Sequence, residues 1–222
     1  MNRSNLDSTL KSLQESDDNI TTLDDGWSQG RSAFGGISAA FAMTAMRKLV
    51  PNDLPLRSLS VSFIAPVPPG KVLVETKIIR KGKSVIQTEA SLVCNDNICL
   101  RAMAAFGYAR ETYKIPPSES LKPKPRGSGV KFEDHAKQTP GFLQFFEGEW
   151  MNDGMPFAGK LSRKLELWVR HNIDLNQFPA ERLITICDIP PPVILSHFSI
   201  PPVPSSSLTW SLEFVIPPEE VS

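Results

Sequence analysis

Residues 35–48 read GGISAAFAMTAMRK, and this stretch decides the fold. Between Ile37 and Met46 it is rich in alanine and methionine and carries no charge, so a helix formed here is apolar on every side. Such a helix is buried all round rather than lying on a surface. The sequence therefore predicts a buried helix near residues 36–49, which Pro51 stops.

Four strands of an antiparallel meander are expected after this helix. Residues 58–63 alternate strictly between apolar and polar side chains, which is the mark of a half-buried strand. Three longer runs follow, separated by short turns, at 71–80, 85–93 and 98–108. Before the helix, residues 8–34 are polar and turn-rich, with room for one short strand. A helix without a polar face, followed by a long antiparallel sheet, predicts an α+β fold in which the sheet wraps around the helix.

The second half of the chain repeats this order in part. Strands are expected at 142–151 and 165–170, before a helix at 179–188 that opens with a proline and an acidic first turn. One alternating strand at 207–216 follows this helix, and then the chain stops. If the second half copies the first, its last three strands are missing.

Proline marks the boundary between the two halves. Five of the 20 prolines precede residue 115, and the stretch after it combines proline and glycine with few apolar residues. That composition is typical of a linker. The sequence thus predicts a first domain over residues 1–112, a linker over 113–140 and an incomplete second domain over 141–222.

Composition and charge narrow the class of protein. The 222 residues hold 24 Lys and Arg against 24 Asp and Glu, and this balance argues against nucleic-acid binding, which needs a basic excess. No run approaches the roughly 18 apolar residues of a membrane span, and the first residues lack the apolar core of a secretory signal. The 3 cysteines do not form a disulfide framework. The cytoplasm is therefore the expected compartment.

Several landmarks of one known family occur in order along the chain. They are Trp27-x2-Gly30-x3-Phe34-Gly35-Gly36-x2-Ala39-Ala40, PLRSLSVSFIAP at 55–66, RKGKS at 80–84, LWVR at 167–170, DIPPP at 188–192 and SSLT at 206–209. Together they resemble the double hotdog acyl-CoA thioesterases, the TesB-like and thioesterase-like superfamily. The resemblance runs from about Trp27 to Phe214.

This resemblance implies a hotdog fold, an antiparallel sheet curled around a helix, with a complete first copy and a partial second copy. It also implies an enzyme of fatty acid metabolism that hydrolyses acyl-CoA to CoA and a carboxylic acid. No metal or cofactor is expected, because a thioester is already activated towards water, and hotdog units commonly pair into homo-oligomers. Family members run further and carry a catalytic glutamine there, so the chain is expected to be truncated. A lost C-terminus would leave a peroxisomal location open.

The resemblance nominates Asp188 as the catalytic carboxylate. Thioester hydrolysis needs a positioned water, a carboxylate to deprotonate it and donors for the developing oxyanion. The apolar neighbours Cys187 and Ile189 would desolvate Asp188 and raise its pKa. The alternative is that Asp188 simply ends a helix before a run of prolines.

Two hydroxyls and one helix start complete the predicted site. Ser207, the closer match to the family, or Thr209 would hold the water or the carbonyl; the alternative is hydroxyls on a solvated strand. Gly35, Gly36 and Ile37 begin the buried helix, where free backbone N–H groups and the helix dipole could bind a thioester carbonyl or a phosphate. A tight turn that lets the helix enter the sheet is the alternative there.

Two other functions stay open at this point. A catalytically impaired acyl-CoA-binding module is favoured by the early end of the chain. A hotdog dehydratase is less favoured, because that reaction usually requires a histidine near the first helix. His135, His171 and His197 all lie elsewhere in the sequence.

Overall fold

The computed structural model describes residues 5–111, 113, 122–134, 139–201 and 203–221. Its helices are α1 (Leu6–Glu15), α2 (Gly35–Arg47) and α3 (Pro179–Cys187), with short 3-10 turns η1 (Asp25–Trp27), η3 (Gly141–Phe145), η4 (Val193–His197) and η5 (Pro218–Glu220). Its strands are β1 (Ile20–Leu23), β2 (Ser28–Gln29), β3 (Ser32–Ala33), β4 (Leu56–Phe63), β5 (Gly70–Lys81), β6 (Val85–Cys94), β7 (Asn97–Gly107), β8 (Val130–Lys131), β9 (Phe146–Trp150), β10 (Leu167–His171) and β11 (Thr209–Glu213).

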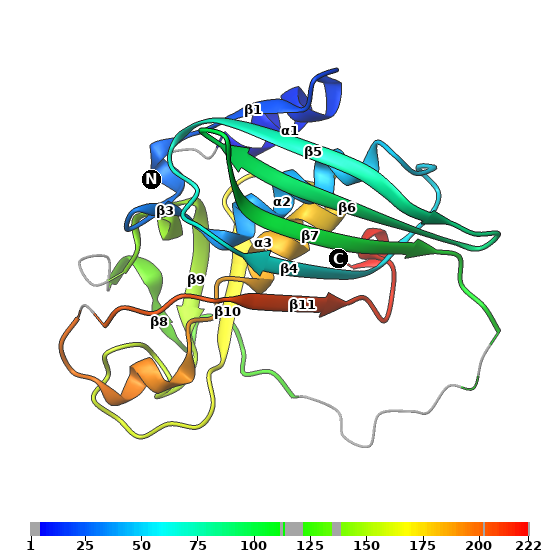
Figure 1. Ribbon diagram of the computed structural model, residues 1–222. Helices are drawn as coiled ribbons and strands as arrows, with labels where there is room; N and C mark the ends of the chain where they lie inside the picture. The colour runs from blue at the N-terminus through cyan, green and yellow to red at the C-terminus, as the bar shows by residue number, and fades with distance from the viewer. Residues whose placement is uncertain (1–4, 112, 114–121, 135–138, 202, 222) are drawn as a thin grey trace.

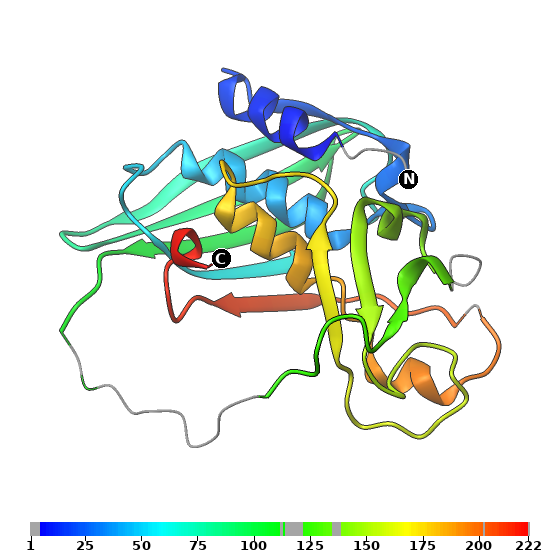
Figure 2. The same cartoon turned by 180° about the vertical axis from the view of Figure 1, so that it is seen from behind.

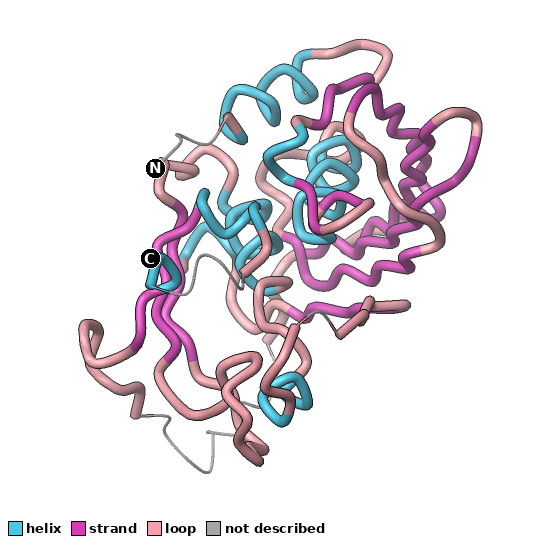
Figure 3. Tube along the Cα trace, turned by 90° about the vertical axis from the view of Figure 1, so that its left-hand side faces the viewer, coloured by secondary structure: helices cyan, strands magenta, loops and turns pink. Residues whose placement is uncertain are grey.

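Helix α2 lies inside a curled antiparallel sheet, as the sequence predicts. Every residue from Gly36 to Met46 is buried, and strands β5, β6 and β7 pack against the helix. The sheet has six strands in the order β1-β5-β6-β7-β4-β11 (Figure 1). Viewed from the side in Figure 3, its strands curl around the helix. The predicted α+β arrangement is therefore confirmed.

The outermost strand of this sheet comes from the second half of the chain. Strand β11 pairs antiparallel with β4, from Thr209 opposite Ser62 to Glu213 opposite Ser58. Within β11, Trp210 and Leu212 are the alternate residues that pack against the core. The second half of the chain thus adds one strand to the sheet of the first half.

Helix α3 lies beside α2 and runs antiparallel to it (Figure 2). The start of α2 meets the end of α3, since a Cβ on Gly36 would stand 3.0 Å from the Cα of Thr185. At the other end, the Thr44 hydroxyl donates a hydrogen bond of 2.9 Å to the Glu181 carboxyl. Strands β9 and β10 lie on the far side of α3, in a second sheet of order β10-β9-β8.

Two local expectations differ from the structure. Residues 6–15 form helix α1, where the sequence reading expected only polar turns; Leu6, Leu10 and Leu13 are its buried face. The strand expected at 142–151 begins instead as the 3-10 turn η3 and becomes a strand only at Phe146. Aromatic packing explains this, since the Phe142 ring stacks on Phe34 at 4.0 Å.

The expected linker is not wholly irregular. Within it, β8 pairs with β9, from Val130 opposite Trp150 to Lys131 opposite Glu149. Residues 114–121 and 135–138 of the same segment lie outside the described part of the chain. Among the helices that are described, none combines the length and the apolar character needed to cross a bilayer.

Candidate active site

Asp188 and the start of α2 lie together, although some 150 residues separate them in the sequence. Asp188 directly follows the last residue of α3. Its carboxylate oxygen Oδ2 lies 2.7 Å from the position that a Cβ on Gly35 would occupy. The backbone N–H of Gly36 faces the same carboxylate and favours its charged form. The structure therefore brings the predicted acid and the predicted helix start into one site.

The two glycines allow this close approach. A Cβ on Gly36 would lie 2.6 Å from the Phe34 ring and 3.0 Å from the Thr185 backbone. Real Cβ atoms do not approach neighbours so closely without displacing them, so any larger residue would push α3 away from α2. Glycine at these positions thus makes room for α3 and its carboxylate, a packing role that the sequence reading did not foresee.

Burial tunes the acidity of Asp188. Desolvation raises its pKa to about 7, and the Gly36 N–H opposes part of that rise. The side chain is only half-buried, so solvent still reaches it. A carboxyl group with a pKa near neutrality can accept a proton from water and return it, which a general base must do. The predicted rise of the Asp188 pKa is confirmed.

Phe63 forms a wall of this site, and the sequence reading did not single it out. Its ring carbon Cε1 lies 2.9 Å from the same Gly35 Cβ position that the Asp188 carboxylate approaches. Phe63 is the last residue of β4 on the face turned towards α2, in step with the buried Leu59 and Val61. That place in the alternating pattern is the sequence feature that could have found it.

In the described part of the chain, the two predicted hydroxyls make no hydrogen bond to the Asp188 carboxylate. Thr209 is exposed opposite Ser62, on the sheet face opposite to that of Trp210, so it points away from α2. Ser207 is also exposed and precedes β11. Its neighbour Leu208 accepts a hydrogen bond of 2.9 Å from the Phe63 N–H. Ser207 is therefore a sequence neighbour of the residue that bonds to Phe63, and Thr209 is not brought into the site.

Ile37 contributes its side chain to the core and not to a surface. The whole residue, backbone included, is 1% exposed, so Ile37 offers no surface to a substrate in this structure. Amides of the first helical turn have no acceptor within the helix, and Gly35 is only partly buried, so its N–H can point at a ligand. Among the described residues, no cluster of three or more His, Cys, Asp or Glu side chains could hold a metal ion.

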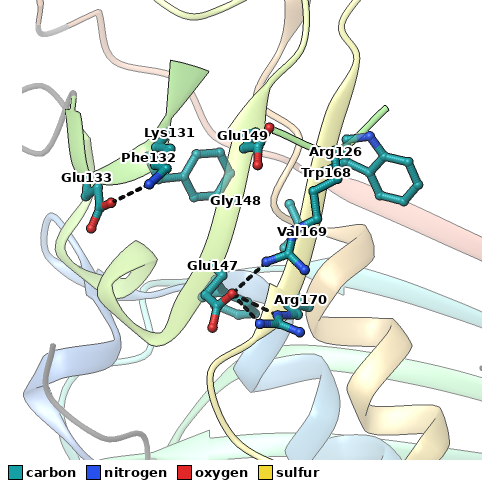
Figure 4. Close-up of a pocket in the computed structure, with 11 residues that line it drawn as sticks. Arg126, Lys131, Phe132, Glu133, Glu147, Gly148, Glu149, Trp168, Val169 and Arg170 are labelled. Atoms are coloured by element: carbon teal, nitrogen blue, oxygen red, sulfur yellow. Dashed lines mark hydrogen bonds and ion pairs between the residues drawn. The ribbon is translucent and has the colours of Figure 1, made fainter. Parts of the chain in front are cut away.

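A separate cavity of about 410 Å³ lies on the β8-β9-β10 sheet (Figure 4). Its lining does not include Asp188, and its positive charges are already paired. Arg126 and Arg170 both contact the Glu147 carboxylate, at 2.9 and 2.6 Å, and Lys131 contacts Glu133 at 3.5 Å. Asp188 and this cavity therefore lie at different places in the molecule.

Comparison with known proteins identifies the two halves. A sequence profile of the acyl-CoA thioesterase N-terminal domain matches residues 23–107, and a profile of the acyl-CoA thioesterase C-terminal domain matches residues 119–222. A search of proteins with curated function gave no significant match.

Solved structures show the same architecture. A conserved protein of unknown function with a hot dog fold from Alicyclobacillus acidocaldarius aligns with a TM-score of 0.75 and 20% identity, over 90% of this chain and 74% of its own. A proposed thioesterase II from Thermobifida fusca aligns with a TM-score of 0.72 and 15% identity, over 95% and 80% of the two chains. The acyl-CoA thioesterase II TesB2 from Mycobacterium marinum aligns with a TM-score of 0.55 and 15% identity, over 81% and 66%.

At these identities the structural likeness establishes the fold alone, and it confirms the predicted hotdog. The family follows from the two profiles, which describe the N-terminal and C-terminal domains of one kind of protein and together match most of the sequence. The chain belongs to the acyl-CoA thioesterase family.

Proposed function

We propose that the protein hydrolyses an acyl-CoA thioester to CoA and a carboxylic acid, with Asp188 as the general base. The observation that carries this proposal is the contact between the Asp188 carboxylate and the start of α2, where a desolvated acid and backbone donors share one site. Membership of the acyl-CoA thioesterase family supports the class of substrate.

The proposed reaction uses groups of this chain alone. The Asp188 carboxylate takes a proton from a water molecule, whose oxygen attacks the thioester carbonyl carbon. Negative charge develops on the carbonyl oxygen and is stabilised by a backbone N–H group in the first turn of α2. Because the Gly36 N–H faces Asp188 and Ile37 is buried, the amide of the partly exposed Gly35 is the proposed donor. The C–S bond then breaks, and the CoA thiolate takes the proton from Asp188.

The test is a thiol-release assay on wild type and Asp188→Asn, against acyl-CoAs of increasing chain length. Asparagine keeps the shape of the side chain but cannot take a proton, so we expect a loss of at least about 100-fold in kcat. Wild-type activity should rise with pH through about 7, as the carboxyl group ionises. The control is Asp17→Asn, an exposed aspartate outside any helix or strand. Equal rates for wild type and Asp188→Asn would exclude Asp188 as the base.

One observation favours the second candidate, a catalytically impaired acyl-CoA-binding module. Within the ranges that the structure describes, neither the Ser207 nor the Thr209 hydroxyl hydrogen-bonds to Asp188, and Thr209 lies on the sheet face turned away from α2. Calorimetric binding of a CoA ester without any thiol release would favour this module over the enzyme. A homo-oligomeric state, the cytoplasm as the compartment and a role in fatty acid metabolism stay predictions.

A further inference from the structure

Helix α3 presents its polar residues to α2 along one face. Glu181, Thr185 and Asp188 follow one another at spacings of four and three residues, which places them on the same side of a helix. Glu181 accepts a hydrogen bond from Thr44, and the Asp188 carboxylate lies against Gly35, so both ends of this row contact α2. Thr185, between them, is held from a different direction.

The partner of Thr185 is His171, the last residue of β10. The His171 Nε2 atom lies 2.8 Å from the Thr185 hydroxyl oxygen and 3.4 Å from the Arg182 carbonyl oxygen. The Thr185 hydroxyl is itself within donor distance of two α3 carbonyls, those of Glu181 at 2.9 Å and Arg182 at 3.0 Å. Since the single hydroxyl proton serves these carbonyls, the His171 Nε2–H is the donor towards Thr185.

The surroundings of His171 hold it in this neutral, donating form. The residue is 8% exposed, its ring packs against Phe146 at a centroid distance of 4.5 Å, and burial lowers its pKa to about 4. Its Nδ1 atom is buried without a hydrogen-bond partner among the described residues, as expected of a nitrogen that carries no proton. The ring therefore keeps one donor, aimed at α3, over the neutral pH range.

We propose that His171 and Thr185 are positioning residues, which fix the last turn of α3 so that Asp188 stays against the start of α2. Thr185 is the residue whose backbone meets Gly36, at 3.0 Å from the Cβ position, and Asp188 follows within one turn. A shift of Thr185 would carry the carboxylate away from the Gly36 N–H and from the Phe63 ring. The proposal rests on the proposed role of Asp188 in catalysis. The claim that His171 and Thr185 fix the position of Asp188 can be tested independently of that role.

The test compares Thr185→Val, which removes the hydroxyl and keeps the shape, with Thr185→Ser, which keeps the hydroxyl. Carboxyl carbon signals of 13C-labelled aspartate are followed through a pH titration of the whole chain, with Asp188→Asn to assign the signal. We expect Thr185→Val to lower the Asp188 pKa by about one pH unit, because a displaced carboxylate is better hydrated. Thr185→Ser should restore the wild-type titration, and the pH profile of kcat should move with the NMR value.

The outcomes separate this inference from the proposed function. If wild type hydrolyses acyl-CoA and Asp188 titrates alike in Thr185→Val and wild type, the positioning role is wrong. A second outcome is that wild type hydrolyses no acyl-CoA while Thr185→Val still changes the Asp188 pKa. That outcome would support the positioning role and exclude the proposed enzymatic function. Should Thr185→Val fail to fold, His171→Gln, which keeps an N–H donor, against His171→Leu gives the same contrast, and equal Asp188 titrations would again overturn the proposal.

Discussion

Helices α2 and α3 lie side by side, yet their surroundings are opposite. Every residue of α2 from Gly36 to Met46 is buried, whereas only four of the nine residues of α3 are. Strands β5, β6 and β7 wrap α2, while α3 contacts mainly α2, β10 and η5. Among the described residues, the wrapped helix supplies small side chains and backbone donors to the site, and the open helix supplies the carboxyl group.

This difference has a physical cause. An unpaired carboxylate in a fully wrapped helix would lose its hydration without compensation, which is among the largest penalties in a folded protein. At the end of α3 the Asp188 side chain is desolvated enough to raise its pKa but remains partly exposed. A proton can therefore leave and return. The comparison predicts that stability depends on α2, and that proton chemistry depends on the edge where α3 touches it.

The largest effect is expected where the two helices meet. Gly36→Val would force atoms into space already filled by Phe34 and the Thr185 backbone, and we expect a loss of about 3 kcal/mol in the free energy of unfolding. Activity should fall with it, because Asp188 leaves the start of α2. Urea denaturation measures the loss. Gly141→Ala is the control, since nothing lies within 4 Å of its added Cβ. Equal stability of the two variants would disprove the close helix contact.

A smaller effect, an increase in the free energy of unfolding, is expected when the charge at the end of α3 is removed, since α2 carries no charge between Gly36 and Met46. The pKa of Asp188 is about 7 in the folded protein and near 3.8 without the fold. Between these values the folded state binds a proton that the unfolded state lacks, so the contribution of Asp188 to stability falls as pH rises from about 4 to 7. Asp188→Asn removes this dependence. After allowance for the exposed part of the side chain, it should stabilise the protein by about 1–2 kcal/mol at pH 8.

Denaturation at pH 4.5 and at pH 8 checks this sign. At pH 4.5 wild type and Asp188→Asn should be nearly equal, since the carboxyl group is protonated in the folded state. A wild type that is the more stable of the two at pH 8 would contradict a desolvated Asp188. The variant that loses activity is thus expected to gain stability, as is common for groups strained by function.

The fold could be predicted where the pattern is local. The uncharged run from Ile37 to Met46 predicted the buried α2, and the strict alternation at 58–63 predicted β4. The pairing of β11 with β4 could not be predicted, because register between strands so far apart depends on the whole packed core. Helix α1 was missed although its leucines stand at helical spacing, since the intervening residues are almost all polar.

In the candidate site, too, local features could be predicted and contacts between distant elements could not. The apolar neighbours of Asp188 in the sequence were enough to predict the direction of its pKa shift. Its contact with Gly35 and Gly36 depends on how α3 packs against α2, which no local spacing encodes. His171 lies 14 residues before its partner Thr185 and on a different element, so along the sequence it was only one of three scattered histidines.

The smallest effects are expected for Ser207 and Thr209, the two hydroxyl residues at β11. They test which part of this strand belongs to the site. Thr209 lies on the sheet face turned away from α2, whereas Ser207 adjoins Leu208, whose carbonyl holds the Phe63 backbone beside the site. We expect Ser207→Ala to lower kcat roughly tenfold and Thr209→Val to change it less than about twofold. Both side chains are exposed, so unfolding free energies should stay within about 0.5 kcal/mol of wild type. The reverse order of activities would mean that Thr209 turns towards Asp188 when substrate binds, and that the outer face of β11 belongs to the site.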